Sequence, residues 1–240
     1  MKKVLVLGAS GNIAPYVTPD LEKDYDLYLS DIVSHPDGKP IINVDITSYP
    51  EVLEVCRGMD AIMNFAVLRD DPVISFEVST KGAYHVMKAA AELGIKKVVH
   101  TGPQSIRHAY DHEFDIDDVP RAPGVGYYGI TKYLSMEICE IFSRTYDIQT
   151  VCFLFNGLGP KPTEHVTQGD FPPFTVVWED LQHACRLALE IESVPGNFQS
   201  FNLLSYFAQG KYQVEKAKRI LGFTPMGGLE DYFRRVTDST

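Results

Sequence analysis

The segment Tyr128-Gly129-Ile130-Thr131-Lys132 places a phenol and an ammonium four residues apart. Residues i and i+4 share one face of a helix. An ammonium in that position can lower the pKa of the phenol and hold the ribose of a nicotinamide cofactor. The phenolate can then take a proton from a substrate hydroxyl while a hydride leaves for NAD. Because this short pattern also arises by chance, the alternative is an exposed helical pair without function.

A glycine turn near the N-terminus could bind the phosphates of such a cofactor. The run from Gly8 to Ala14 follows an apolar segment and has the form GxxGxxA. Glycines allow a tight turn, and they let backbone N–H groups approach a pyrophosphate at a helix N-terminus. Asp31, 20 residues after Gly11, stands where a carboxylate would bind ribose hydroxyls. Since Asp31 would repel a 2′-phosphate, the sequence favours NAD over NADP; the alternative is an ordinary turn and a solvated aspartate.

Short β-branched runs alternate with helical patterns over the first 160 residues, which predicts right-handed βαβ units. The expected strands are 3–7, 26–30, 41–44, 61–66, 97–101, 149–154 and 198–203. The expected helices are 48–57, 76–93, 127–146, 179–192 and 212–221, with a long loop at 107–126. The helix after Gly11 contains Pro15 and Pro19, and we expect it to be short or bent because an interior proline costs ~3 kcal/mol. The fold class is therefore α/β, a Rossmann-like doubly wound parallel sheet.

The composition narrows the class of protein. Of the 240 residues, 45% are apolar or aromatic, and the formal net charge is −10. This balance argues against a disordered chain, and against a nucleic acid or an anionic membrane as the main partner. No apolar run approaches the roughly 20 residues of a membrane span. Four cysteines without a CxxC pair predict free thiols in a reducing cytoplasm, and the histidines lack metal-ligand spacing.

Taken together, these motifs resemble the short-chain dehydrogenase/reductase superfamily, in its extended or atypical branch of NAD-dependent epimerases and dehydratases. Besides the glycine turn and the Tyr128/Lys132 pair, the resemblance includes Asn64-Phe65-Ala66, the strand at 97–101, Asn156 to Pro160, Val177 to Leu181 and Ala217 to Pro225. It implies a single domain over 1–240, with a cofactor half at 1–160 and a small substrate-capping region at 161–240. It also implies a homodimer.

The resemblance implies a set of cofactor-binding residues at the carboxyl ends of the strands. They are Gly8, Ser10, Gly11, Asn12, Ile13, Asp31, Ile32, Asp45, Ile46, Phe65, Ala66, Val67, Thr101, Tyr128, Lys132 and Phe155. Among them, Asp45 is equally suited to cap the helix that follows it.

Within this branch the chain is most similar to uronate dehydrogenases, which oxidise a hexuronic acid with NAD. The second strand, Leu29-Ser30-Asp31-Ile32, contributes to that likeness. A uronate needs a cation for its carboxylate. Arg69 and Arg107 are the candidates, since both follow strands at the edge where doubly wound sheets bind ligands.

The end of the fifth strand departs from the family pattern. The family places a catalytic serine or threonine where this chain has Pro103, which offers neither a hydroxyl nor an N–H group. Ser105 is our prediction for the substitute, with Thr101 two residues before Pro103 as the other hydroxyl. Gln104 and Asn156 complete the expected substrate contacts. The alternative for Ser105 and Thr101 is a purely local hydrogen bond to the backbone. An arginine common in the sixth strand is also absent, with Phe153 in its place.

Three functions follow from these residues. The first is an NAD-dependent oxidoreductase of a sugar or sugar acid, with Tyr128 as general base, Lys132 beside it and Ser105 assisting. The second is a nucleotide-sugar epimerase or dehydratase with tightly held NAD, for which the 80 residues after Pro160 leave little room. The third is a non-catalytic NAD-binding or sensing protein, which the loss of a hydroxyl at Pro103 favours.

Overall fold

The computed structural model describes residues 1–166 and 174–233, and its centre is a parallel sheet in the order β3-β2-β1-β4-β5-β6-β9. These strands are β1 (Lys2–Leu7), β2 (Tyr25–Asp31), β3 (Ile42–Asn43), β4 (Ala61–Asn64), β5 (Lys97–Pro103), β6 (Gln149–Phe155) and β9 (Phe198–Asn202). Two further short strands, β7 (Gly157–Gly159) and β8 (Thr175–Val177), pair with each other in parallel. The reversal of strand order between β1 and β4 is the switch point at which such sheets bind ligands.

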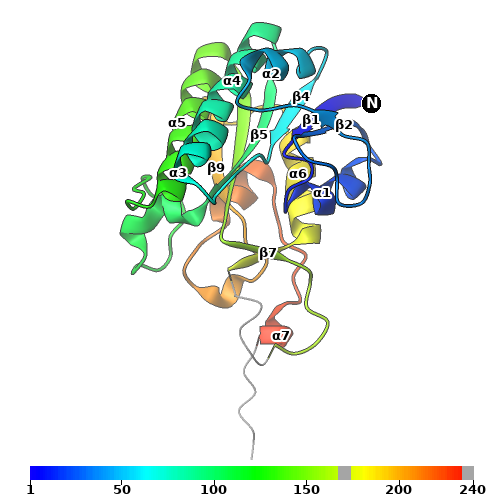
Figure 1. Cartoon of the computed structure of the whole chain (residues 1–240). Helices are drawn as coiled ribbons and strands as arrows, with labels where there is room; N and C mark the ends of the chain where they lie inside the picture. Colours follow the sequence, from blue (N-terminus) through cyan, green and yellow to red (C-terminus); the bar gives the residue numbers. More distant parts are fainter. Residues whose placement is uncertain (167–173, 234–240) are drawn as a thin grey trace, which may run out of the picture.

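Helices cover both faces of the sheet, as Figure 1 shows. On one face α1 (Ala14–Leu21) packs against α6 (Trp178–Glu190). On the other face lie α2 (Tyr49–Val55), α4 (Gly82–Leu93) and α5 (Tyr127–Tyr146), with α4 between α2 and α5. The short α3 (Pro72–Ser75) leads through a π-helical turn at Phe76–Lys81 into α4. The doubly wound α/β fold predicted from the sequence is confirmed.

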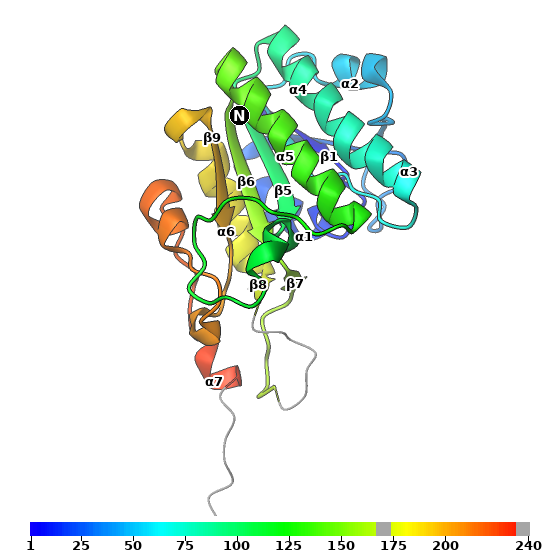
Figure 2. The same ribbon diagram turned by 90° about the vertical axis from the view of Figure 1, so that its left-hand side faces the viewer.

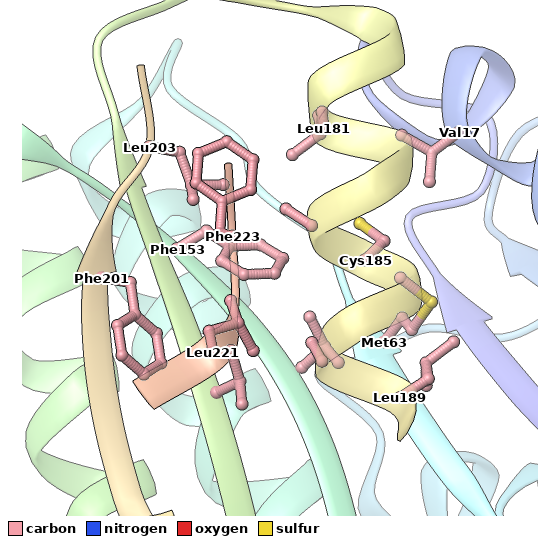
Figure 3. Packing of buried hydrophobic residues seen from close by; sticks show 14 of the residues in the cluster. Val17, Met63, Phe153, Leu181, Cys185, Leu189, Phe201, Leu203, Leu221 and Phe223 are labelled. Atoms are coloured by element: carbon pink, nitrogen blue, oxygen red, sulfur yellow. The ribbon is translucent and has the colours of Figure 1, made fainter. Parts of the chain in front are cut away.

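Each face of the sheet has its own buried apolar cluster. On the α6 side, Leu181 and Cys185 pack toward Phe153 of β6 and Phe201 of β9 (Figure 3). Phe223, from the C-terminal part of the chain, belongs to this same cluster. The C-terminal part therefore shares the core of the sheet. Residues 167–173 and 234–240, part of the expected capping region, lie outside the described residues.

Several element boundaries differ from the expectations for local physical reasons. Helix α1 is short, as expected, with Pro15 in its first turn and Pro19 inside its last. Strand β5 runs two residues further than predicted and ends at Pro103, which pairs with Phe155. A proline is tolerated there because a strand end needs no further N–H donor.

The loop predicted at 107–126 is instead helical in its first part. A 3-10 helix spans Gln104–Tyr110, and the loop after it bends across to the C-terminal part, where Ile116 forms a bridge with Tyr212 (Figure 2). That bridge also corrects the helix predicted at 212–221. Tyr212 lies in extended backbone against Ile116, and a π-helical turn spans Ala217–Leu221. Three other short helical segments lie in the C-terminal part: the 3-10 helices η3 (Pro195–Asn197) and η4 (Phe207–Gln209), and α7 (Glu230–Phe233).

The described part of the chain contains no helix long and apolar enough to cross a membrane. Its His, Cys, Asp and Glu side chains form no group of three or more that could hold a metal ion. All four cysteines are buried and unpaired.

Candidate active site

The turn after β1 is built so that only glycine fits at its first position. Gly8 has a φ of +76°, and a Cβ there would lie 2.6 Å from the backbone nitrogen of Ala66. The turn thus presses against the end of β4, and the N–H group of Gly11 donates to the carbonyl of Gly8 at 3.2 Å. Helix α1 begins at Ala14, a fully buried small residue that lets the helix approach the sheet. Backbone N–H groups at the start of α1 can therefore reach a phosphate.

Asp31, the last residue of β2, ties this turn to the neighbouring loop. Its carboxylate accepts hydrogen bonds from the N–H groups of Ser10 at 2.9 Å, Ile32 at 2.7 Å and Val33 at 3.3 Å. The Ser10 hydroxyl in turn donates to the carbonyl of Val33. The carboxylate is held at the carboxyl edge of the sheet, where it can accept bonds from ribose hydroxyls.

A cavity of about 360 Å³ extends from the glycine turn along the ends of β1, β2, β3 and β4. Every cofactor-binding residue predicted between Gly8 and Val67 lies in its wall, and so does Arg69. Asp45 lines it while accepting a hydrogen bond from the N–H of Thr47 at 2.8 Å. Thr47 precedes α2, whose N-cap is Ser48, so Asp45 orders the turn before the helix and does not cap the helix itself. The motif analysis missed Val33 and Val44, which lie just beyond β2 and β3. Their position just after predicted strands is the feature of the sequence that could have identified them as cavity residues.

Tyr128 and Lys132 lie in the first turns of α5, which has the predicted bounds. Tyr128 is half-buried, whereas Lys132 is 2% exposed. Burial raises the pKa of the Tyr128 phenol, and the nearby Arg69 guanidinium opposes this by lowering that pKa. Burial also lowers the pKa of the Lys132 ammonium to about 8. Both groups are thus sensitive to any charge that enters the site.

Helix α5 is fixed against β5 by two residues that the sequence analysis did not single out. The Nε2 atom of His100 lies 2.9 Å from the hydroxyl of Ser135, which itself donates to the carbonyl of Lys132. Burial holds the pKa of His100 well below its ordinary value, so the imidazole is neutral. Gly102 lets the helix approach, because a Cβ there would lie 3.0 Å from Met136. The packing of α5 against β5 therefore determines where Tyr128 and Lys132 lie relative to the end of that strand.

The polar residues around Pro103 differ in how far they are exposed to solvent. Ser105, the predicted hydroxyl, is exposed, whereas Thr101 is buried. Gln104 is 1% exposed, and neither polar atom of its amide has a hydrogen-bond partner among the described residues. A buried amide without partners is costly, and a ligand that bonded to it would remove that cost. Phe155, opposite Pro103, is half-buried, and Asn156 after it is exposed.

The two arginines predicted to meet a substrate carboxylate have separate environments. Arg107 is 3% exposed, and its Nη1 atom donates to Asn202 Oδ1 at 2.6 Å. Asn202 donates in turn to the carbonyls of Ile116, Asp117 and Gln213. Arg107 therefore links the segment after β5 to β9, and its substrate contact stays a prediction. Arg69 is exposed, and its guanidinium carbon lies 4.5 Å from the centroid of the Tyr128 ring.

Comparisons with known proteins show which family the sequence matches and which solved structures share its fold. The sequence profile of the "NAD dependent epimerase/dehydratase family" matches residues 4–173. The "uncharacterized protein YtbQ" of Bacillus subtilis is 30% identical over 160 residues, 59% of this chain and 62% of that protein. The uronate dehydrogenase of Pseudomonas putida is 26% identical over 168 residues, 67% of this chain and 62% of the enzyme. The matches thus span about 62% of the length of these curated relatives.

Among solved structures, a "mutated uronate dehydrogenase" superimposes with a TM-score of 0.83 at 21% identity. The match covers 100% of this chain and 89% of that one. At this identity the likeness establishes the fold.

Proposed function

Because the chain belongs to the NAD dependent epimerase/dehydratase family, we propose that it is an NAD-dependent oxidoreductase that acts on a sugar or a sugar acid. The observation that supports this most directly is the position of Tyr128. It is half-buried, it precedes the buried Lys132 by one helical turn, and Arg69 beside it lines the cavity of the glycine turn.

The residues of the cavity fit NAD. The glycine at position 8 lets the turn pack directly against the backbone of Ala66, and the start of α1 offers N–H groups to the pyrophosphate. The Asp31 carboxylate would accept hydrogen bonds from the ribose hydroxyls, and its negative charge would repel a 2′-phosphate. NAD, when bound, supplies the acceptor for the hydride that leaves the carbinol carbon of the substrate.

In this proposal Tyr128 is the general base. Its phenolate oxygen accepts the hydroxyl proton of the substrate as the carbonyl forms, and the group becomes a neutral phenol. Lys132, one turn along the helix, holds the nicotinamide ribose. Burial lowers the pKa of Lys132 to about 8, and an anion or a hydrogen-bond acceptor beside the amine would raise it and favour the ammonium form.

We assign the orientation of the substrate hydroxyl to Gln104, with Ser105 and Thr101 as the hydroxyls predicted from the motif. Gln104 follows Pro103 directly, and its buried amide offers a donor and an acceptor without partners among the described residues. Arg69 is the cation open to a carboxylate, if the substrate is a sugar acid. A homodimer packed through α4 and α5, whose surfaces expose Tyr84 and Ile141, is part of the same proposal. Sedimentation velocity tests it.

The test compares Tyr128→Phe with Tyr146→Phe, an exposed tyrosine at the other end of the same helix. Each protein is assayed for NAD reduction with a panel of hexuronates and neutral aldoses. Tyr128→Phe is expected to lower kcat/KM by about 10²-fold or more, because a positioned base contributes that much. Tyr146→Phe is expected to match the wild type. Turnover by Tyr128→Phe at the wild-type rate would show that the base is another group.

The non-catalytic alternative is favoured by one observation. Pro103 removes the hydroxyl of the family pattern, and the nearby Ser105 is exposed. This alternative predicts that NAD raises the melting temperature by mass action while no sugar of the panel is oxidised.

A further inference from the structure

The loop between β4 and α3 carries Arg69 to the face of the Tyr128 ring. The guanidinium carbon lies 4.5 Å from the ring centroid, which is the geometry of a cation–π contact. The residue is otherwise exposed, so one side of the guanidinium meets the phenol and the rest faces solvent. The two residues are 59 positions apart in the sequence. Their contact therefore depends on how the loop is held.

Three hydrogen bonds hold this loop. The hydroxyl of Tyr127 donates to the carbonyl of Arg69 itself. The hydroxyl of Ser75 donates to the carbonyl of Leu68 at 2.7 Å. The Asp71 carboxylate accepts from the N–H group of Ile74 at 2.9 Å and so caps α3. Tyr127 therefore holds Arg69, and Arg69 in turn stacks on the ring of Tyr128.

Arg69 stands without an ion-pair partner in the part of the chain that the structure describes. Arg57 on the preceding loop, by contrast, pairs with Glu54 at 2.8 Å. An arginine keeps its charge at every pH at which the protein is folded. A fixed positive charge therefore stands beside the phenol whether or not the site is filled.

We propose that Arg69 is a second cation of the catalytic machinery, which stabilises the Tyr128 phenolate before it accepts the substrate proton, and that Tyr127 is the positioning residue that holds Arg69 there. The inference rests on the proposed function in taking Tyr128 as the base. It gives the site a permanent cation on the face of the ring, in addition to the ammonium one helical turn away.

The electrostatics of the site support this assignment. Burial raises the pKa of Tyr128, and the charge that lowers it is that of Arg69. Lys132 is buried and has its own pKa lowered to about 8, in part by Arg69. Lys132 thus loses its charge at alkaline pH, whereas Arg69 keeps its own.

The experiment measures kcat/KM against pH for NAD reduction, with the substrate found in the panel of hexuronates and neutral aldoses. The variants are Arg69→Met, Arg69→Lys and the control Arg57→Met. Arg57 is exposed and precedes β4, so it lies at the opposite edge of the sheet. Arg69→Met is expected to move the acidic limb of the profile to higher pH by about one unit, since a single charge at a partly exposed site has an effect of that order. Arg69→Lys is expected to restore most of that shift, and Arg57→Met to leave the profile in place.

Tyr127→Phe tests the positioning role, because it removes only the hydroxyl that bonds to the Arg69 carbonyl. It is expected to move the acidic limb in the same direction by less, with the plateau at high pH unchanged. If Arg69→Met raises KM for hexuronates alone and leaves the acidic limb in place, Arg69 only binds substrate and the inference is wrong. If Tyr127→Phe leaves the limb unmoved while Arg69→Met shifts it, the positioning role is wrong.

A second readout does not depend on turnover, and it separates this inference from the proposed function. The Tyr128 phenol is titrated by NMR in the NAD-saturated protein with carbon-labelled tyrosine, and its signal is assigned by its loss in Tyr128→Phe. A higher titration midpoint in Arg69→Met than in the wild type supports the inference even if every sugar of the panel fails. An unchanged midpoint overturns it even if the enzyme oxidises a sugar.

Discussion

The most direct test of the cofactor turn is Gly8→Ala. The φ of +76° costs an alanine about 1–2 kcal/mol, because its Cβ approaches the adjacent carbonyl. The new Cβ would also lie 2.6 Å from the nitrogen and 2.8 Å from the Cα of Ala66, and both are backbone atoms. Backbone moves less readily than a side chain, so we add the roughly 1–3 kcal/mol of an overpacked site. The expected loss of unfolding free energy is therefore about 2–5 kcal/mol.

Gly58→Ala is the matched control for the backbone term. Gly58 has a φ of +75°, nearly that of Gly8, but a Cβ there has no neighbour within 4 Å. It precedes β4 and so lies away from the cavity. This variant is expected to lose only the about 1–2 kcal/mol of the left-handed conformation. The difference between the two variants isolates the contact of the turn with β4.

Urea unfolding gives the two free energies, and calorimetric titration gives NAD affinity. Gly8→Ala is expected to bind NAD at least about tenfold more weakly, since a displaced turn realigns the N–H groups that meet the pyrophosphate. Gly58→Ala is expected to bind NAD like the wild type. Equal unfolding free energies and equal NAD affinities in the two variants would refute the argument that the turn is built against β4.

Two further predictions concern buried cations. Because burial lowers the pKa of Lys132 from 10.5 to about 8, keeping its ammonium form in the folded protein costs roughly 3 kcal/mol near neutral pH. Lys132→Met is thus expected to unfold at higher urea than the wild type below about pH 8, with the gain fading as pH rises toward 10.5; a gain that does not depend on pH would contradict this. Arg107→Met leaves Asn202 Oδ1 without its donor and is expected to lose about 2–4 kcal/mol in urea unfolding with an unchanged KM. If the Arg107→Met protein is as stable as the wild type and has a raised KM, that result would support the substrate contact predicted from the sequence.

The parts of the site that the sequence predicted are those set by local pattern. Helix α5 has the predicted bounds because its apolar stripe is long and Asp147, in the left-handed region, ends it. The turn at Gly8 and the carboxylate of Asp31 were predictable because the end of a parallel strand fixes which edge its next residues occupy. Strand alternation likewise determined the sheet.

The parts that the sequence did not predict depend on partners far away in the chain. Arg107 and Arg69 both follow strands, and no local signal separates them. The difference comes from Asn202, 95 residues after Arg107, which accepts its hydrogen bond. The bridge of Ile116 with Tyr212 likewise shortened a helix whose own pattern favoured an earlier start.

The two cations near Tyr128 also predict how the site responds to pH. Burial lowers the pKa of Lys132 to about 8, whereas Arg69 is exposed and stays charged. Below that pH, Lys132 and Arg69 are both charged, and the charge of Arg69 lowers the pKa of the Tyr128 phenol. Above it, only Arg69 is charged, and the amine of Lys132 that would meet NAD is neutral. Cofactor affinity should therefore weaken as pH rises through 8, while the effect of Arg69 on the phenol persists. Lys132→Met has no amine that titrates in this range. If its NAD affinity also weakens as pH rises through 8, another group causes the pH dependence.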